Sequence, residues 1–332
     1  MKIQFLNVGQ GDSIILQWVR DEKIKVGIID CKNNKSPNST IEQLKAIKPE
    51  SIDFIILSHP HSDHFSGMED LLTYLITENI PVHHFYTTAT ISPNRIMLSV
   101  KGKVAKNAVT SLFKMLKDLY TKDLLPMYFM NETDIDMLLN SEWRLKIMSP
   151  STSEIDTYSS TANYNIVRQE EEPDNEPKGN LLSTFLAIHC ERSYFLLTSD
   201  TVLKTFQRVD KKYRNFFSGK KLLLGQIPHH GSKENYSSTF WKTKNPEKKE
   251  MPAVISVGTN GYHHPNKDIM TNLSKLGYEI YKTEDLSNTK ESENIRSLLS
   301  AISLSSSIVP DKQSPEAEAI SFKLTPDTIT KL

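Results

Sequence analysis

The spacing of apolar residues changes repeatedly along the first half of the chain, from alternation or short apolar runs to a helical repeat. The apolar run IDFIIL over residues 52–57 is typical of a strand buried on both faces. Thr40 is the expected N-cap of the first helix. Strands are predicted over 2–6, 13–18, 25–29, 52–57, 82–86 and 143–148. Helices are predicted over 40–48, 68–78 and 105–120.

The second half repeats this alternation after a polar segment over 149–179. The acidic run in that segment predicts an exposed loop and consists of Glu170, Glu171, Glu172, Asp174 and Glu176. Residues 284–316 are Ser-rich and charged, which is typical of a flexible insertion before the last strand. Strands are predicted over 181–188, 194–198, 221–227, 253–257, 278–281 and 319–324, and helices over 202–217 and 267–276.

Strands in both halves, with helices between and outside them, predict an α/β fold in which two sheets pack face to face under a cover of helices. The chain has 332 residues, 38% hydrophobic and 24% charged, as in an ordinary globular protein. This length fits one large domain or two ordinary ones.

The formal net charge is zero, so bulk electrostatics gives no argument for nucleic-acid binding. A local basic stretch follows residue 200, and it indicates either a surface for a polyanion such as single-stranded DNA or RNA, or a solvated helix face. Its members are Lys204, Arg208, Lys211, Lys212, Arg214, Lys220 and Lys221, with Lys242, Lys244, Lys248 and Lys249 further on.

Cys31 and Cys190 are the two cysteines, too few for a disulfide-stapled scaffold, and we expect free thiols in a reducing compartment. The N-terminal residues lack the apolar core and cleavage site of a signal peptide. No segment reaches the roughly 20 apolar residues that span a bilayer. The expectation is a cytoplasmic protein without a membrane segment.

The run HPHSDH over residues 59–64 places four potential metal ligands at the end of an apolar strand. His59 and His61 are two residues apart, so an extended backbone points both rings the same way. Asp63 and His64 fall in the following turn and can face a second ion. Imidazole and carboxylate suit Zn²⁺, and also Mn²⁺ or Fe. Only ten histidines occur in the chain, so this cluster indicates a metal site rather than a polar loop.

A two-metal site also needs a bridging carboxylate and a further histidine. Asp200 ends a strand of the second half, and His229 and His230 end the next strand. Strand ends that converge on one edge of a sheet are where α/β folds place their sites. Taken alone, Asp200 is better explained as a helix N-cap, but the neighbouring pattern favours a ligand.

The HPHSDH run resembles the His-x-His-x-Asp-His signature of the metallo-β-lactamase superfamily, and IID over 28–30 resembles its first-motif aspartate. Further blocks resemble, in the same order, the metallo-β-lactamase-like domain of the competence protein ComEC. These are FLNVGQGDS over 5–13, NLLS over 180–183, LTSD over 197–200, PHHGS over 228–232 and YHHP over 262–265. The resemblance extends over about residues 1–283 and the final strand.

This resemblance implies a single metallo-β-lactamase αβ/βα sandwich over 1–332, with two mixed sheets flanked by helices. It implies two divalent metal ions at the top of the sandwich, with Zn²⁺ as the first choice and Mn²⁺ as the alternative. The implied ligands are His59, His61 and Asp200 for the first ion, and Asp63, His64, Asp200 and His230 for the second. Bacterial phosphorylcholine esterases of similar type favour His230 over His229.

The chain departs from the superfamily pattern near the first ion. Asn180 stands where many members carry a histidine, so we expect this ion to have few ligands. Ser199 replaces a usual glycine. Asp30 and Asp12 are expected to orient the ligand histidines, although a turn beside Gly11 explains Asp12 equally well. Further residues expected near the ligands or the substrate are Asn180, Ser232 and His263.

Together these residues predict a metal-dependent hydrolase in which a hydroxide held between two ions, with Asp63 beside it, attacks phosphorus. His264 or His229 is the expected proton donor to the leaving oxygen, because imidazole titrates near neutrality. The expected substrate is a phosphate ester, such as a single-stranded nucleic acid or a nucleotide. The alternatives are a hydrolase of a small ester, lactam or thioester, and a non-catalytic component of a multi-protein system, for example in bacterial defence, with a partner encoded nearby.

Overall fold

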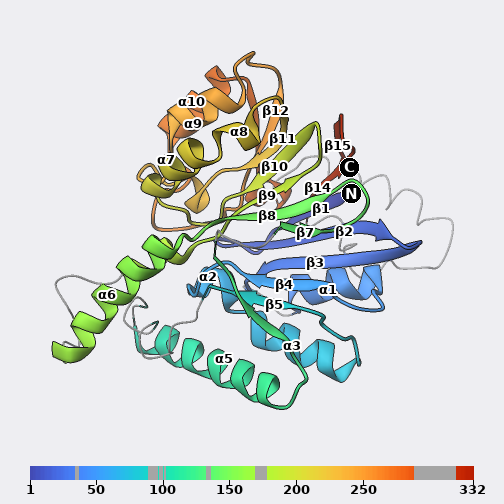
Figure 1. Cartoon of the computed structure of the whole chain (residues 1–332), viewed down its shortest axis with the longest axis vertical. Coiled ribbons are helices and arrows are strands. Elements are labelled where there is room, and N and C mark those ends of the chain that lie inside the picture. The colour runs from blue at the N-terminus through green and yellow to red at the C-terminus, as the bar shows by residue number, and fades with distance from the viewer. Residues whose placement is uncertain are drawn as a thin grey trace, which may run out of the picture.

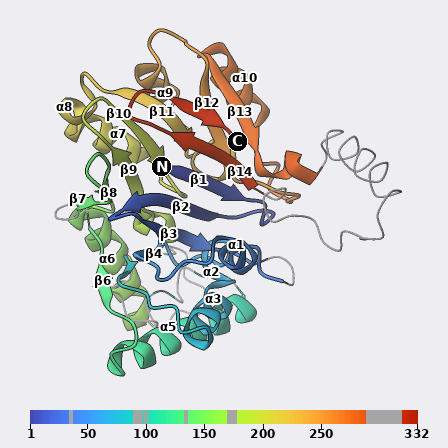
Figure 2. The ribbon, with the colours of Figure 1, turned by 90° about the vertical axis from the view of Figure 1, so that its right-hand side faces the viewer.

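The computed structural model describes residues 1–33, 37–88, 96, 100, 102–131, 136–168, 178–287 and 319–332. The acidic run over 170–176 and nearly all of the 284–316 insertion lie outside the described residues, so these two predictions are not tested. Two β-sheets lie face to face, and helices cover the outer face of each (Figures 1 and 2). The structure thus has the metallo-β-lactamase fold class that the sequence predicts, an αβ/βα sandwich of two mixed sheets.

Within the described residues, the first sheet has eight strands in the order β15-β14-β1-β2-β3-β4-β5-β6. The strands β3 to β6 run parallel, whereas the others pair antiparallel. Their bounds are β1 (Lys2–Leu6), β2 (Ser13–Arg20), β3 (Lys23–Cys31), β4 (Phe54–Leu57), β5 (Phe85–Thr87), β6 (Met127–Phe129), β14 (Ala319–Leu324) and β15 (Ile329–Lys331).

The second sheet, over the same described ranges, has the order β13-β12-β11-β10-β9-β8-β7. The strands β10 to β13 run parallel, and β7 to β10 pair antiparallel. Their bounds are β7 (Asp136–Leu138), β8 (Arg144–Ser149), β9 (Phe185–His189), β10 (Ser193–Leu197), β11 (Lys221–Gln226), β12 (Met251–Ile255) and β13 (Tyr278–Lys282).

The core is divided among three apolar layers. Buried side chains of facing strands, such as Phe5 and Leu186, fill the space between the sheets. A second cluster joins the first sheet to α1 (Ser39–Ile47), α3 (Met68–Thr77) and α5 (Lys103–Thr121). A third joins the second sheet to α7 (Leu203–Lys212), α8 (Arg214–Phe217), α9 (Ser238–Lys244) and α10 (Lys267–Lys275). Because the sheets are buried on both faces, their parallel strands are apolar runs rather than alternating ones.

The polar segment over 149–179 contains a helix that the sequence pattern does not predict, α6 (Thr152–Arg168). The signal for its start is a capping box at Ser151 and Glu154. The Glu154 amide donates to Ser151 Oγ over 3.2 Å, and the Ser151 amide donates to Glu154 Oε2 over 2.7 Å.

Other element boundaries also differ from the prediction. The N-cap of α1 is Asn38, whose side chain accepts from the Thr40 amide over 3.0 Å, so the assignment to Thr40 is wrong. The predicted helix over 202–217 is two helices that meet at Tyr213. Residues 179–182 form the 3₁₀ turn η2 (Gly179–Leu182) ahead of β9. Cys31 and Cys190 are buried free thiols, as predicted.

Candidate metal centre

The candidate ligands all follow strands that end at one edge of the two sheets. The loop after β4 carries His59 and His61 and leads into the short helix α2 (Ser62–Phe65), which carries Asp63 and His64. In the second sheet, Asp200 follows β10, and the turn η3 (His229–Gly231) follows β11. Parallel strands β10 and β11 bring their carboxyl ends together. The centre is therefore assembled from both sheets.

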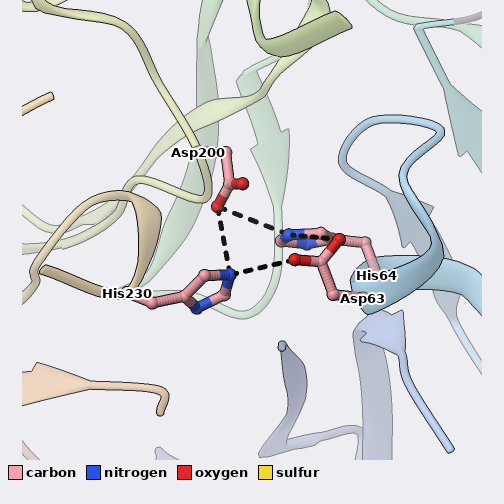
Figure 3. Close-up of side chains that lie close together, drawn as sticks. All are labelled: Asp63, His64, Asp200 and His230. Atoms are coloured by element: carbon pink, nitrogen blue, oxygen red, sulfur yellow. Dashed lines mark ion pairs between the residues drawn. The ribbon is translucent and has the colours of Figure 1, made fainter. Parts of the chain in front are cut away.

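The structure brings together the two groups of side chains that the sequence predicts. Ligand atoms of the first group, His59, His61 and Asp200, lie within 4.8 Å of one another. The same holds for the second group, which consists of Asp63, His64, Asp200 and His230. Figure 3 shows this second group, with the four side chains pointing toward one another. Asp200 belongs to both groups and so occupies the position of a bridging carboxylate.

The two carboxylate oxygens of Asp200 face different histidines. Oδ1 lies 3.4 Å from Nε2 of His64 and 3.6 Å from Nε2 of His230. Oδ2 lies 3.7 Å from Nε2 of His59 and 3.4 Å from Nε2 of His229. Asp63 Oδ2 also lies 3.3 Å from His230 Nε2. Donors around a tetrahedral Zn²⁺ with bonds near 2.0–2.1 Å are roughly 3.3–3.5 Å apart, so these spacings suit metal coordination.

Several of these donor atoms are buried and make no hydrogen bond with any described residue. They are Nε2 of His59, His61, His64 and His230, and Oδ1 of Asp200. Buried polar atoms without partners are costly, and a cluster of them aimed at one point needs an explanation. Cations between them would satisfy all five, so the donor set fits two divalent metal ions.

The charges of the metal-free centre support this fit. Burial alone raises the pKa of Asp200, but the imidazoles of His229, His64 and His230 lower it well below its usual range. Burial lowers the pKa of His230, and the Asp200 carboxylate outweighs this and raises it to about 9. The pKa of His64 is raised well above its ordinary value in the same way, against the effect of burial, by Asp200, Asp30 and Asp63. The buried carboxylates thus favour positive charge at these two rings, and a bound cation also supplies positive charge there.

Asp30 contacts His64, one of the candidate ligands. Its Oδ2 lies 2.7 Å from His64 Nδ1, so His64 Nε2 is left to face Asp63 and Asp200. Ser58 fixes the carboxylate by donating its amide to Oδ1 over 2.7 Å and its hydroxyl to Oδ2 over 2.6 Å.

The sequence leaves two roles open for Asp12, orienting a ligand histidine or forming a turn beside Gly11. Asp12 lies 3.7 Å from His64 Nδ1, beyond hydrogen-bonding distance, and both its oxygens accept from Gln226 Nε2 over 3.0 Å. Gln226 Oε1 in turn accepts from the backbone amides of Thr198 and Ser199. The Asp12 amide also donates to the Asp63 carbonyl over 3.0 Å. Asp12 therefore links the backbone segments that carry Asp63 and Asp200.

Sequence reasoning missed the side chains that hold the ligands from behind. Ser199 donates its hydroxyl to Ser58 Oγ over 2.9 Å, which joins the two halves of the chain behind His59. His230 Nδ1 lies 2.7 Å from the Ser256 carbonyl, which directs Nε2 to the centre. Asn235 contacts His229 Nδ1 over 2.9 Å. Gln226 was detectable as a polar residue that ends a buried strand, but the others become visible only in the folded chain.

Three of the remaining predicted residues, His264, Asn180 and Ser232, lie beside His229. His264 is partly buried, and its ring centroid lies 5.7 Å from that of His229. His263 is exposed. Asn180 Nδ2 lies 3.4 Å from His229 Nδ1. Ser232 is buried, and its amide donates to the His229 carbonyl over 2.9 Å, which closes the η3 turn.

The basic stretch after Asp200 is partly directed inward. Arg208 pairs with Glu154 over 3.0 Å, and Lys244 pairs with Asp210 over 2.7 Å. Lys204 and Lys211 of α7 are exposed. This stretch is thus neither wholly a solvated helix face nor wholly available to a polyanion. Among the described residues, no helix combines the length and apolarity needed to cross a bilayer.

Comparison with known proteins agrees with the fold. Residues 19–91, which include the HPHSDH run, match the model of the metallo-beta-lactamase superfamily. Over these residues the chain resembles that superfamily, whose members are mostly metal-dependent hydrolases. No curated protein matches the sequence.

Solved structures of low identity are also similar. The metallo-beta-lactamase fold protein YhfI from Bacillus subtilis has 11% identity and a TM-score of 0.46, over 85% of this chain and 97% of that one. Zn²⁺-bound PqqB from Methylobacterium extorquens has 12% identity and a TM-score of 0.46, over 85% of this chain and 98% of that one. A diphosphatase from the PhnP family has 13% identity and a TM-score of 0.41, over 85% of this chain and 95% of that one. The activities in these names belong to those proteins.

Proposed function

We propose that this protein is a metal-dependent hydrolase of the metallo-β-lactamase superfamily, in its ComEC-like branch, that cleaves phosphodiester bonds. The observation that carries the proposal is the bridging position of Asp200, one oxygen of which faces His64 and His230 while the other faces His59 and His229. Nε2 of His59, His64 and His230 is buried and unpaired, and a buried carboxylate between such nitrogens is the arrangement that a two-metal hydrolase needs.

In this proposal the first ion is held by His59, His61 and Asp200, and the second by Asp63, His64, Asp200 and His230. Zn²⁺ suits the imidazole-rich donor set best, and Mn²⁺ is the alternative. Bound ions supply Lewis acidity that activates water near neutral pH and neutralises charge on the substrate oxygens.

The protein's own residues bind and orient the substrate. Asn180, whose side chain lies beside His229, would present its amide to a phosphate oxygen. His264 donates the proton to the leaving oxygen, because its ring stands beside His229 at the edge of the centre. Burial, with the charges of His229 and His230, lowers the pKa of His264, so its protonated form is a stronger acid than free imidazolium.

Phosphate esters are favoured over carboxylic esters because two neighbouring cations can hold both sides of a phosphoryl group in line. Exposed Lys204 and Lys211 on α7, just after Asp200, add positive charge that suits a polyanion. The proposed substrate is therefore a nucleotide or single-stranded nucleic acid. The competing function is hydrolysis of a small ester or lactam, and a further alternative is a non-catalytic role within a multi-protein assembly.

A substrate panel tests these functions. The protein loaded with Zn²⁺ or Mn²⁺ is expected to cleave bis(p-nitrophenyl) phosphate and single-stranded DNA, and to lose both activities with EDTA or with Asp200→Asn. His264→Ala should cost about 10²–10⁴-fold on DNA, whose alkoxide leaving group needs a proton, and much less on p-nitrophenolate esters. Turnover of only p-nitrophenyl acetate or a lactam would favour the competing hydrolase. Metal uptake without any turnover would favour the non-catalytic role.

A further inference from the structure

His229 and His59 lie near the same oxygen of the Asp200 carboxylate. His229 Nε2 lies 3.4 Å from Oδ2 of Asp200, the same oxygen that faces His59. His230, the next residue, faces the other oxygen. The two histidines of the η3 turn are thus divided between the two oxygens of one carboxylate, which the left-handed backbone at both residues permits.

Asn235 determines which nitrogen of His229 is free. The Asn235 amide group donates from Nδ2 to the backbone carbonyls of Asp200 and Thr201, over 3.2 and 3.1 Å. This leaves Oδ1 of Asn235 to contact His229 Nδ1 over 2.9 Å, and an oxygen acceptor there requires a proton on Nδ1. In the neutral ring, Nε2 then carries a lone pair that points at the Asp200 carboxylate, and a cation between the two atoms resolves that repulsion.

The segment that gives many superfamily members a histidine at the first ion supplies no imidazole here. A Cβ at Gly179 would lie 2.3 Å from His61 Nε2, so a residue with a side chain would clash with the His61 ring. Only the backbone of this segment therefore contacts the ring at position 179. Asn180 approaches His229 Nδ1 over 3.4 Å, and its amide can present either its oxygen or its nitrogen there. This segment therefore supports His229 from behind.

We propose that His229 is a ligand of the first metal ion and replaces the histidine missing at position 180. This inference rests on the proposed metal centre. The first ion then has four protein donors, His59, His61, His229 and one oxygen of Asp200. The second ion also has four, from Asp63, His64, His230 and the other oxygen. With His229 engaged as a ligand, His264 remains the proton donor.

Metal titration of single-site backgrounds tests the proposal without any substrate. Asp63→Ala removes a donor of the second site only, and His61→Ala removes a donor of the first site only. His229→Asn is added to each, because asparagine tolerates the left-handed backbone at this position, where φ is 48°. Zn²⁺ affinity is measured by calorimetry, and Co²⁺ absorption reports the number of imidazole ligands. Exposed His83→Asn is the matched control, and circular dichroism of the metal-free variants checks folding.

In the Asp63→Ala background, His229→Asn should weaken the remaining site by at least about 10–100-fold, the range for losing a group that only orients a ligand. The Co²⁺ spectrum should change with it. In the His61→Ala background, His229→Asn should leave the Zn²⁺ affinity of the second site within about twofold of the value for His61→Ala alone. Equal losses in both backgrounds, or none in the first, would overturn the role of His229 while leaving the metal centre intact. A wild-type protein that binds no metal would overturn the proposed function as well.

Discussion

At the scale of single residues, the candidate ligands are held in place through the ring nitrogen that faces away from the centre. Nδ1 of His64 contacts Asp30, Nδ1 of His230 contacts the Ser256 carbonyl, and Nδ1 of His229 contacts Asn235. Left-handed backbone conformations also gather here, at Asp30, Ser199, His229, His230 and His263. Such conformations persist only where surrounding contacts fix them, and they are typical of functional sites.

Asp30→Asn tests whether Asp30 orients the His64 ring, because asparagine keeps the shape of the aspartate side chain. The carboxylate accepts from His64 Nδ1 and twice from Ser58, and an amide can satisfy only part of that set. Metal affinity should fall by about 10–100-fold. The control is Asp53→Asn, a buried carboxylate paired with Arg20 outside the centre, which should leave affinity unchanged. Equal metal affinities for wild type and Asp30→Asn would show that Asp30 does not orient a ligand.

The candidate ligands could be identified from the sequence because of where they stand relative to the strands. The HPHSDH run, Asp200 and His230 each follow an apolar strand, and strand ends converge in this kind of fold. Asn235 and Ser58 were not predictable, because an asparagine or serine gains its role only from the contact that folding provides. The same reason explains Asp12, which is close to the centre as predicted but binds Gln226 rather than a histidine.

At the scale of helices and strands, long periodic segments such as α5 and apolar runs such as β11 were predicted well. The helix α6 was missed because polar residues dominate it, and the three-residue strands β6, β7 and β15 are too short to show a period. The N-terminus of α6 is nevertheless fixed by strong contacts, since Glu154 caps the helix and also binds Thr205 and Arg208 of α7.

Glu154→Ala should therefore destabilise the junction of α6 and α7. It removes a cap and leaves the partly buried Arg208 without its carboxylate, at a cost of about 1–3 kcal/mol in the free energy of unfolding. Urea unfolding of wild type, Glu154→Ala, Arg208→Ala and the double variant measures the coupling. If the two single changes simply add, the ion pair contributes nothing and the cap alone explains the loss.

At the scale of the whole molecule, the candidate centre joins the two sheets. The donors at 59–64 extend from the first sheet, and Asp200 and the η3 turn extend from the second. The apolar layer between the sheets and any ions bound at their edge would thus be separate sources of cohesion. Anything that binds only the folded state stabilises it by mass action, about 2.7 kcal/mol for each site at one hundred times its dissociation constant.

Metal stabilisation should grow with pH. In the metal-free protein the pKa of His230 is raised to about 9, so its extra stability is fully present below pH 6.5 and is lost as pH rises toward 9. Over the same window metal has fewer protons to displace, and its apparent affinity rises. The difference in melting temperature between Zn²⁺-loaded and EDTA-treated protein should therefore widen from pH 6.5 to 9. Asp200→Asn, which lacks the bridging charge, should show a small and nearly constant difference. A wild-type difference that does not change with pH would mean that no ring in the centre gives up a proton to the metal.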